Sequence, residues 1–159
     1  MRAPTDTDPG MSDVLIRQAE PHDVHAVRQL LLSHRLPLEG ADRHFAEFAV
    51  AVDGSTVIGC AGAELYGASA LLRSVAVTPA WQRMGVGRQL VRHLLNGVRR
   101  RNVRTVYLLT TTASDYFAAL GFRTVDRADA PLPLKASSQF HSACPADAAL
   151  MALGLAPVP

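Results

Sequence analysis

Runs of apolar residues divide the first half of the chain into strands joined by short turns. Apolar stretches and turn residues predict four strands, over 14–19, 50–52, 56–66 and 71–78. Asp53-Gly54 and Gly67-Ala68-Ser69 are tight-turn sequences, so the last three strands are expected to form an antiparallel meander. A helix is predicted to begin at Pro21, and a short second helix is predicted over 45–49.

The second half alternates between helices and strands. An amphipathic helix is predicted over 85–102, with Val86, Leu90 and Leu94 on its apolar face and arginines opposite. It is followed by a buried strand over 103–110, a short helix over 114–120, a strand over 122–126, a loop-rich segment over 129–147 and a closing strand over 149–153. This order predicts an α+β fold, with a mixed, mostly antiparallel sheet of about six to seven strands and helices on both faces.

Length and charge limit the classes of partner. The 159 residues suit one domain, which we place at 13–155 behind a disordered leader at 1–12. The net charge of +2 is too small to indicate nucleic acid, and no apolar run reaches the roughly 18 residues that cross a bilayer. The N-terminus lacks a signal peptide, so a cytoplasmic protein is expected, without nucleic-acid or membrane partners. The apolar tail over 148–155 is a candidate homodimer surface.

The two cysteines, Cys60 and Cys144, are too few for a disulfide framework. Three arrangements are open: one disulfide, two buried thiols, or a pair that binds a soft metal. We adopt two buried thiols as the simplest interpretation and expect no metal site.

The turn between the strand over 71–78 and the long helix carries the chemical information. It has the spacing Gln82-x-x-Gly85-x-Gly87. Glycines let backbone N–H groups approach an anion, and the first turn of a helix adds unpaired donors and the positive end of its dipole. Arg83 and Arg88 can add charge-assisted hydrogen bonds. The segment is therefore a candidate pyrophosphate site, although it lacks the Gly-Lys-Ser/Thr of a Walker loop and the third glycine of a dinucleotide loop.

This spacing is similar to the pyrophosphate motif of the GNAT family of N-acetyltransferases. The resemblance spans about residues 14–127 and includes Tyr116-Phe117-Ala118-Ala119-Leu120-Gly121-Phe122, which resembles the family's aromatic-x-x-x-Gly-Phe helix end. Within the family, the chain resembles the acetyltransferases named for arsenic-resistance operons, through the segments 64–67, 71–77, 107–112 and 140–145.

The resemblance implies a sheet that splays between its fourth and fifth strands, with acetyl-CoA as cosubstrate in the opening. Its implied cofactor contacts are Val75, Ala76, Val77, Gln82, Arg83, Gly85, Val86, Gly87, Arg88, Tyr116 and Phe117. Backbone groups of Val75 and Val77 are expected to pair with the pantetheine arm, and the Val75 N–H to steady the thioester oxygen as it becomes negative.

Attack on a thioester needs a neutral amine, so some group must accept its proton. Glu64 is the first candidate, because a carboxylate in an apolar strand is costly unless it is used. The alternative is that Glu64 faces solvent. Glu39 and His44 are further candidates for the base, and Glu39 and Arg73 are candidate acceptor-binding residues. Arg73 is suited to hold an acceptor carboxylate, or else it is a surface cation.

The usual proton donor to the departing thiolate in this family is a tyrosine four residues before the Gly-Phe pair. Phe117 occupies that position, and Tyr116 precedes it. Because one residue turns a helical side chain by about 100°, the role is open. Either Tyr116 donates the proton to the thiolate in place of the usual tyrosine, or it has a packing or cofactor-contact role and the thiolate leaves unprotonated into water.

Three functions follow from these observations. The first is direct N-acetylation of a small-molecule amine in a ternary complex, including an amino-acid-like toxic compound or an organoarsenical. The second is a non-catalytic module that senses acetyl-CoA or an arsenical, in which Cys60 and Cys144 would bind the arsenical. The third is acetylation of a protein or peptide. An acyl relay through Cys144 is a further alternative to direct transfer.

Overall fold

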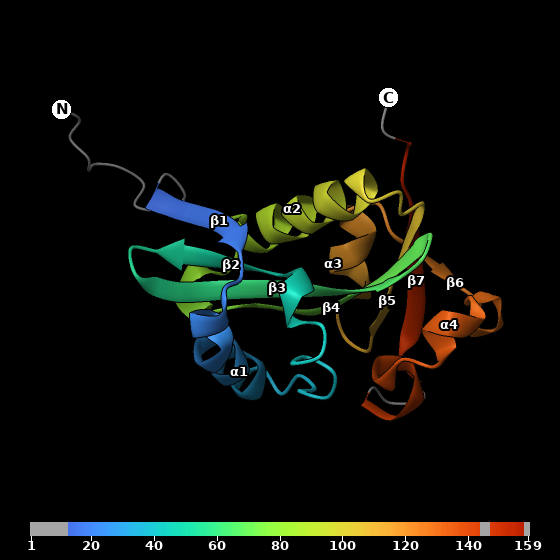
Figure 1. Ribbon diagram of the computed structural model, residues 1–159, viewed down its shortest axis with the longest axis horizontal. Coiled ribbons are helices and arrows are strands. Elements are labelled where there is room, and N and C mark those ends of the chain that lie inside the picture. The colour runs from blue at the N-terminus through green and yellow to red at the C-terminus, as the bar shows by residue number, and fades with distance from the viewer. Residues whose placement is uncertain (1–12, 144–146, 158–159) are drawn as a thin grey trace.

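In the computed structural model, which describes residues 13–143 and 147–157, the chain forms one seven-stranded sheet (Figure 1). Its strands are β1 (Val14–Gln18), β2 (Phe48–Asp53), β3 (Thr56–Tyr66), β4 (Ser69–Val77), β5 (Thr105–Thr110), β6 (Arg123–Val125) and β7 (Ala149–Gly154). They lie in the order β1-β2-β3-β4-β5-β7-β6, with β4 and β5 parallel and the other neighbours antiparallel. The predicted mixed sheet is confirmed. The expected leader at 1–12 and Cys144 lie outside the described residues.

Helices cover both faces of the sheet, as predicted. They are α1 (Val24–Ser33), α2 (Val86–Arg100), α3 (Ser114–Ala119) and α4 (Leu132–Lys135), with shorter turns at Pro21–Asp23, Phe45–Glu47, Pro79–Trp81, Arg127–Asp129 and Gln139–Ala143. Figure 1 shows α2 and α3 on one face and α1 and α4 on the other. The fold is therefore a sheet between two helical layers.

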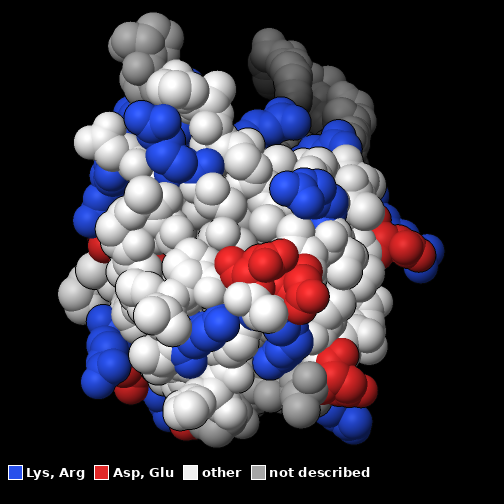
Figure 2. All heavy atoms as spheres, turned by 90° about the vertical axis from the view of Figure 1, so that its right-hand side faces the viewer, with Lys and Arg blue, Asp and Glu red and all other residues white. Residues whose placement is uncertain are grey.

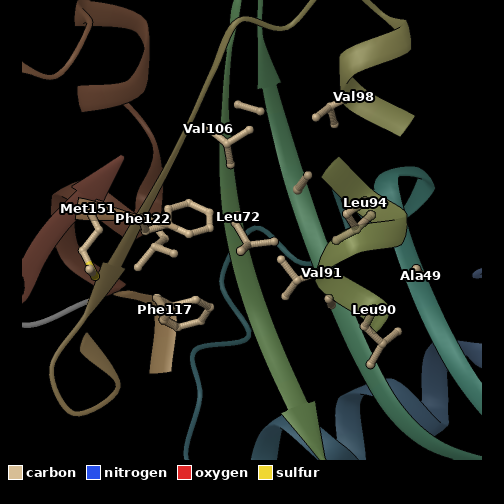
Figure 3. Packing of buried hydrophobic residues seen from close by; sticks show 14 of the residues in the cluster. Ala49, Leu72, Leu90, Val91, Leu94, Val98, Val106, Phe117, Phe122 and Met151 are labelled. Atoms are coloured by element: carbon tan, nitrogen blue, oxygen red, sulfur yellow. The ribbon is translucent and has the colours of Figure 1, made fainter. Parts of the chain in front are cut away.

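Side-chain alternation along the strands supplies a core to each layer. Ala49 and Ala51 of β2 face the core beneath α2, whereas Phe48 and Val50 face the core beneath α1. Figure 3 shows the α2 side of the sheet, where the labelled side chains of α2 belong to the same buried cluster as Leu72 of β4. Phe117 continues this core toward β5 and β7, so α2 and α3 are both fixed against the strands that border the site.

The sheet opens between β4 and β5, as expected. The two strands pair over three positions, from Ser69↔Thr105 to Leu71↔Tyr107, after which β5 pairs with β7. Along the β3 side, Cys60 pairs with Ala76 and Gly62 with Arg73, so β4 carries one extra residue, a β-bulge. Ser74 lies there with a φ of 60°, in the left-handed region. Among the described residues, the edge of β4 that faces β5 thus has no strand partner beyond Leu71.

Charge is not collected into one basic surface on the face that carries β6, β7 and α4. Figure 2 shows basic and acidic side chains interspersed among uncharged ones there, with an acidic cluster near the centre. Within the part of the chain that the structure describes, no helix combines the length and the apolar character that a membrane crossing requires.

Candidate functional site

The turn after β4 prepares an anion site at the start of α2. Gly85 is the N-cap residue, with a φ of 87° that favours glycine, and the first bond of the helix runs from the Gln89 N–H to the Gly85 carbonyl at 3.0 Å. The backbone N–H groups of residues 86–88 therefore have no partner within the helix. The Gln82 side chain donates to the Val77 carbonyl at 2.8 Å, which ties the turn to the end of β4.

A cavity of about 610 Å³ joins this helix start to the unpaired edge of β4. Ten of the eleven residues expected to contact the cofactor line it: Val75, Ala76, Val77, Gln82, Arg83, Gly85, Gly87, Arg88, Tyr116 and Phe117. The eleventh, Val86, places its side chain in the core, where it is 1% exposed. Its contribution is limited to the backbone N–H at the start of α2.

Tyr116 and Phe117 of α3 take different places, as a shift of one residue along a helix requires. Phe117 is buried, with Tyr116 and Phe122 in edge-to-face contact with its ring. Tyr116 is 43% exposed and reaches across the cavity to the α2 turn, where a Cβ added at Gly87 would lie 2.5 Å from its hydroxyl oxygen. Burial raises the pKa of Tyr116, so its hydroxyl keeps its proton near neutral pH.

A second cavity, of about 510 Å³, lies along the same stretch of β4. Both cavities are lined by His34, Val75, Ala113 and Phe117, so they meet at the bulged part of the strand. Arg35, Arg73 and Ser74 line the second cavity, together with the threonines at 110–112. Two ligands that occupied the two cavities would approach each other beside Val75.

Glu64 and Arg73 form a buried ion pair on the α1 and α4 side of the sheet. Arg73 donates to the Glu64 carboxylate at 2.7 Å, and their side chains are 0% and 1% exposed. The carboxylate also accepts from the Tyr66 hydroxyl at 2.5 Å and the Ser137 hydroxyl at 2.6 Å. Arg73 also donates hydrogen bonds to the Ser74 hydroxyl at 3.0 Å and to the Pro37 carbonyl at 3.2 Å.

These contacts set the titration of the cluster. Burial works to raise the pKa of Glu64, but hydrogen bonds from Ser137, Tyr66 and Arg73 outweigh it and hold that pKa below its ordinary value. Burial and the bond to Glu64 raise the pKa of Tyr66 to about 12. Glu64 is therefore a carboxylate fixed to Arg73, and it lines neither cavity.

The other two candidates for the base lie outside both cavities. His44 Nε2 is 3.8 Å from the Glu64 carboxylate, and burial lowers the pKa of this imidazole. Glu39 is exposed, and its backbone carbonyl accepts a bond of 3.4 Å from Ser138. Their assignment as bases, like that of Glu64, stays a prediction.

Two residues at the end of α1 were missed by the reasoning from sequence. His34 lines both cavities, and its ring nitrogens lie 2.9 Å from the Leu30 carbonyl and 2.8 Å from the Val77 carbonyl. Arg35 follows it on the wall of the second cavity. Proximity of α1 to the end of β4 is a tertiary contact, and the local sequence gives no signal for it.

Cys60 is a buried thiol, as expected of one of the two cysteines. Its Sγ donates to the Ser74 carbonyl at 3.3 Å, and burial raises its pKa to about 12. Within residues 13–143 and 147–157, no group of three or more His, Cys, Asp or Glu side chains is placed to hold a metal ion.

Comparison with known proteins identifies the type of domain. The sequence profile of the family described as "Acetyltransferase (GNAT) domain" matches residues 44–124, half of the chain. An amino-acid acetyltransferase of Neisseria meningitidis serogroup A is 28% identical over 128 residues, which cover 74% of this chain and 29% of that protein. The chain thus spans less than a third of the length of this relative.

Solved structures share the fold. N-acetylglutamate synthase of Neisseria gonorrhoeae, complexed with coenzyme A and N-acetyl-glutamate, superposes with a TM-score of 0.78 at 22% identity, over 90% of this chain and 35% of that one. The ribosomal-protein-S18-alanine N-acetyltransferase of Escherichia coli superposes with a TM-score of 0.70 at 22% identity, over 92% of this chain and 96% of that one. At these identities the likeness concerns the arrangement of strands and helices.

Proposed function

Since this chain belongs to the acetyltransferase (GNAT) domain family, we propose that it transfers the acetyl group of acetyl-CoA to the amine of a small molecule. One observation carries the proposal: a single cavity connects the unpaired edge of β4 with the open N–H groups at the start of α2. An extended pantetheine arm can add to a strand edge, and a diphosphate can bind the helix start. The second cavity supplies the place for the amine.

In this mechanism the amine nitrogen attacks the thioester carbon beside Val75. The Val75 N–H donates to the carbonyl oxygen as negative charge develops there. The C–N bond forms and the C–S bond breaks, and the amine proton passes to water in the second cavity. Tyr116 is the proposed proton donor to the departing thiolate, because it lines the cofactor cavity and stays protonated at neutral pH.

Glu64 has a positioning role in this proposal. A carboxylate whose pKa is lowered by three hydrogen-bond donors is a weak proton acceptor. Its bond to Arg73 orients the Arg73 side chain, which lines the second cavity, the proposed acceptor cavity. Arg73 in turn holds the Pro37 carbonyl and the Ser74 hydroxyl, which fixes the α1 connection against the bulge of β4. The pair thereby shapes the wall that the acceptor meets.

His34→Ala is expected to tighten CoA binding by about two- to tenfold. In the structure the Val77 carbonyl already accepts from the Gln82 side chain and lies 2.8 Å from His34 Nε2, so both of its lone pairs have partners. A pantetheine amide that bonds to this carbonyl must displace one of them. Isothermal titration of CoA into the two proteins measures the difference.

His25→Ala is the matched control, because His25 is an exposed histidine on the same helix and lines neither cavity. Its CoA affinity is expected to equal that of the unmodified protein. Unchanged or weaker CoA binding in His34→Ala would show that His34 supports the cofactor instead of competing with it.

Activity is tested by incubating the protein with acetyl-CoA and a panel of amines while released thiol is titrated. The panel contains amino acids, toxic amino-acid analogues that include an arsenic-bearing one, and peptides that begin with alanine. We expect thiol release and an acetylated product by mass spectrometry with at least one small amine. Turnover of the arsenic-bearing analogue would support the function that the resemblance to the arsenic-resistance subgroup implies.

Two other functions are separated by the same experiment. A sensor module would bind acetyl-CoA, seen as thermal stabilisation, with no turnover of any amine. A peptide acetyltransferase, favoured by the likeness to the enzyme that modifies ribosomal protein S18, would acetylate the alanine peptides before the amino acids. Turnover confined to the peptides would replace the small-molecule proposal.

A further inference from the structure

The connection that follows α1 holds an arginine in an unusual backbone conformation. Arg35 has a φ of 57° in the left-handed region, at the position after the helix C-cap His34. Its N–H donates to the Leu32 carbonyl at 3.1 Å, and the next N–H, of Leu36, donates to the Leu31 carbonyl at 2.9 Å. This pair of bonds is the Schellman motif, whose left-handed residue is usually glycine. An arginine there is held against a backbone preference of about 1–2 kcal/mol.

Arg35 lies on the wall of a cavity whose described lining residues carry no negative charge. Arg35 lines the acceptor cavity, and none of the described residues that line this cavity is an Asp or a Glu. Apart from Arg35 and Arg73, the residues with polar side chains around it are His34, Ser74, Gln139 and the threonines at 110–112. Such a wall favours an anionic ligand and disfavours an acceptor with several positive charges.

The positive charge of Arg73, the other arginine of this cavity, is already balanced by a carboxylate. Arg73 is paired with the Glu64 carboxylate at 2.7 Å, and it donates further to Ser74 and Pro37. Arg35 has no ion-pair partner among the residues that the structure describes. The uncompensated positive charge of the acceptor cavity therefore belongs to Arg35.

We propose that Arg35 is a specificity-determining residue that binds the carboxylate of the acceptor, which makes the preferred acceptor an amino acid or a similar amine that carries an anionic group. The inference rests on the proposed function for the amine, but the anion site stands on the cavity itself. A planar guanidinium can donate two parallel bonds to a carboxylate, and charge-assisted bonds of this kind are stronger than neutral ones. The backbone strain at Arg35 is then tolerated for the sake of its side chain.

The test uses non-reactive probes, so that binding is measured without turnover. Acetate, succinate and glutarate are compared with acetamide, succinamide and glutaramide by isothermal titration, in the presence and absence of CoA. We expect at least one carboxylate to bind about tenfold or more tightly than its amide, as expected for charged hydrogen bonds. In Arg35→Gly this preference disappears, while the thermal midpoint stays the same or rises, because glycine suits the left-handed conformation.

Asn102→Gly is the matched control. Asn102 also has a positive φ, of 70°, but it lies after α2 and lines neither cavity. It is expected to keep the full preference for carboxylates. Equal binding of carboxylates and amides by the unmodified protein, or a preference that survives in Arg35→Gly, overturns the proposal. A failure of CoA to bind overturns the proposed function instead, because the carboxylate preference is also measured without CoA.

Discussion

Glu64→Gln is expected to lower the free energy of unfolding by about 3–5 kcal/mol, because it leaves the Arg73 guanidinium buried without its counter-ion. The two side chains are 2.7 Å apart and almost completely excluded from solvent, so solvent compensates poorly for the lost charge. Glutamine keeps the size of the side chain, which separates the loss of charge from the creation of a cavity. Urea denaturation at neutral pH measures the change.

Two further variants make the result specific to the buried pair. Glu47→Gln removes a carboxylate from the ion pair with Arg101, which is as short, at 2.6 Å, but has an Arg101 side chain that is 55% exposed. It is expected to cost less than about 1 kcal/mol. In the double variant Glu64→Gln with Arg73→Met, much of the loss is recovered, because no charge is left unpaired. If Glu64→Gln lowers the free energy of unfolding by no more than Glu47→Gln does, the Glu64–Arg73 pair does not behave as a buried ion pair.

The same pair predicts how stability depends on pH. The pKa of Glu64 in the folded protein lies below its ordinary value of 4.5, so unfolding takes up a proton in the acidic range. The stabilisation is complete above pH 4.5 and is lost as the pH falls through the lowered pKa of the folded state. The difference in stability between the unmodified protein and Glu64→Gln should therefore shrink below pH 4.5, and a constant difference would contradict this linkage.

Gly87→Ala is expected to raise the dissociation constant of CoA by about 10- to 100-fold, because the added methyl group enters the space above the first turn of α2. A Cβ there would lie 2.5 Å from the Tyr116 hydroxyl and 3.7 Å from Val77. Tyr116 is exposed enough to rotate away, so the thermal midpoint should change little. Titration calorimetry with CoA, together with a thermal melt, checks both parts.

Two other glycines provide the comparison. Gly97 lies within α2 with open space around its Cα, so Gly97→Ala should stabilise the helix slightly and leave CoA binding intact. Gly85 has open space too, but its φ of 87° means that Gly85→Ala costs stability by straining the backbone. If Gly87→Ala bound CoA as well as Gly97→Ala does, the diphosphate would have to bind elsewhere.

The order of elements was predictable because each was marked locally. The turn at Asp53-Gly54, the proline after β4 and the glycines at the start of α2 are short-range signals, and they place β3, β4 and α2 to within a few residues. The position of β7 between β5 and β6 was not predictable in this way. It depends on long-range pairing, and the alternation of side chains in a six-residue strand does not specify which strands will be its neighbours.

The site was predictable where it depends on backbone and periodicity. The glycine spacing indicated the helix start, and the 100° turn per residue separated Tyr116 from Phe117. The Glu64–Arg73 pair was within reach of the sequence, because the turn at 67–68 sets Glu64 opposite Leu71, two residues from Arg73 on the same face. The left-handed conformation of Arg35 was not predictable, because the position holds neither of the residues that favour this conformation, glycine and asparagine.

The extra residue at Ser74 has a consequence for how β4 tolerates change. Before it, Ala70 and Leu72 pack into the core beneath α2, and after it, Val75 and Val77 do so, so odd and even positions exchange faces at this point. Deleting Ser74 would restore simple alternation, with Val75 still toward α2 and Ala76 still toward the α1 side, whereas deleting a residue from the regular part of the strand would exchange the faces of the residues on one side of the deletion. The extra residue therefore adds length to β4 without changing which side chains reach each core. Sequence alignments of β4 should accordingly tolerate a one-residue gap at Ser74 and not in the regular parts of the strand.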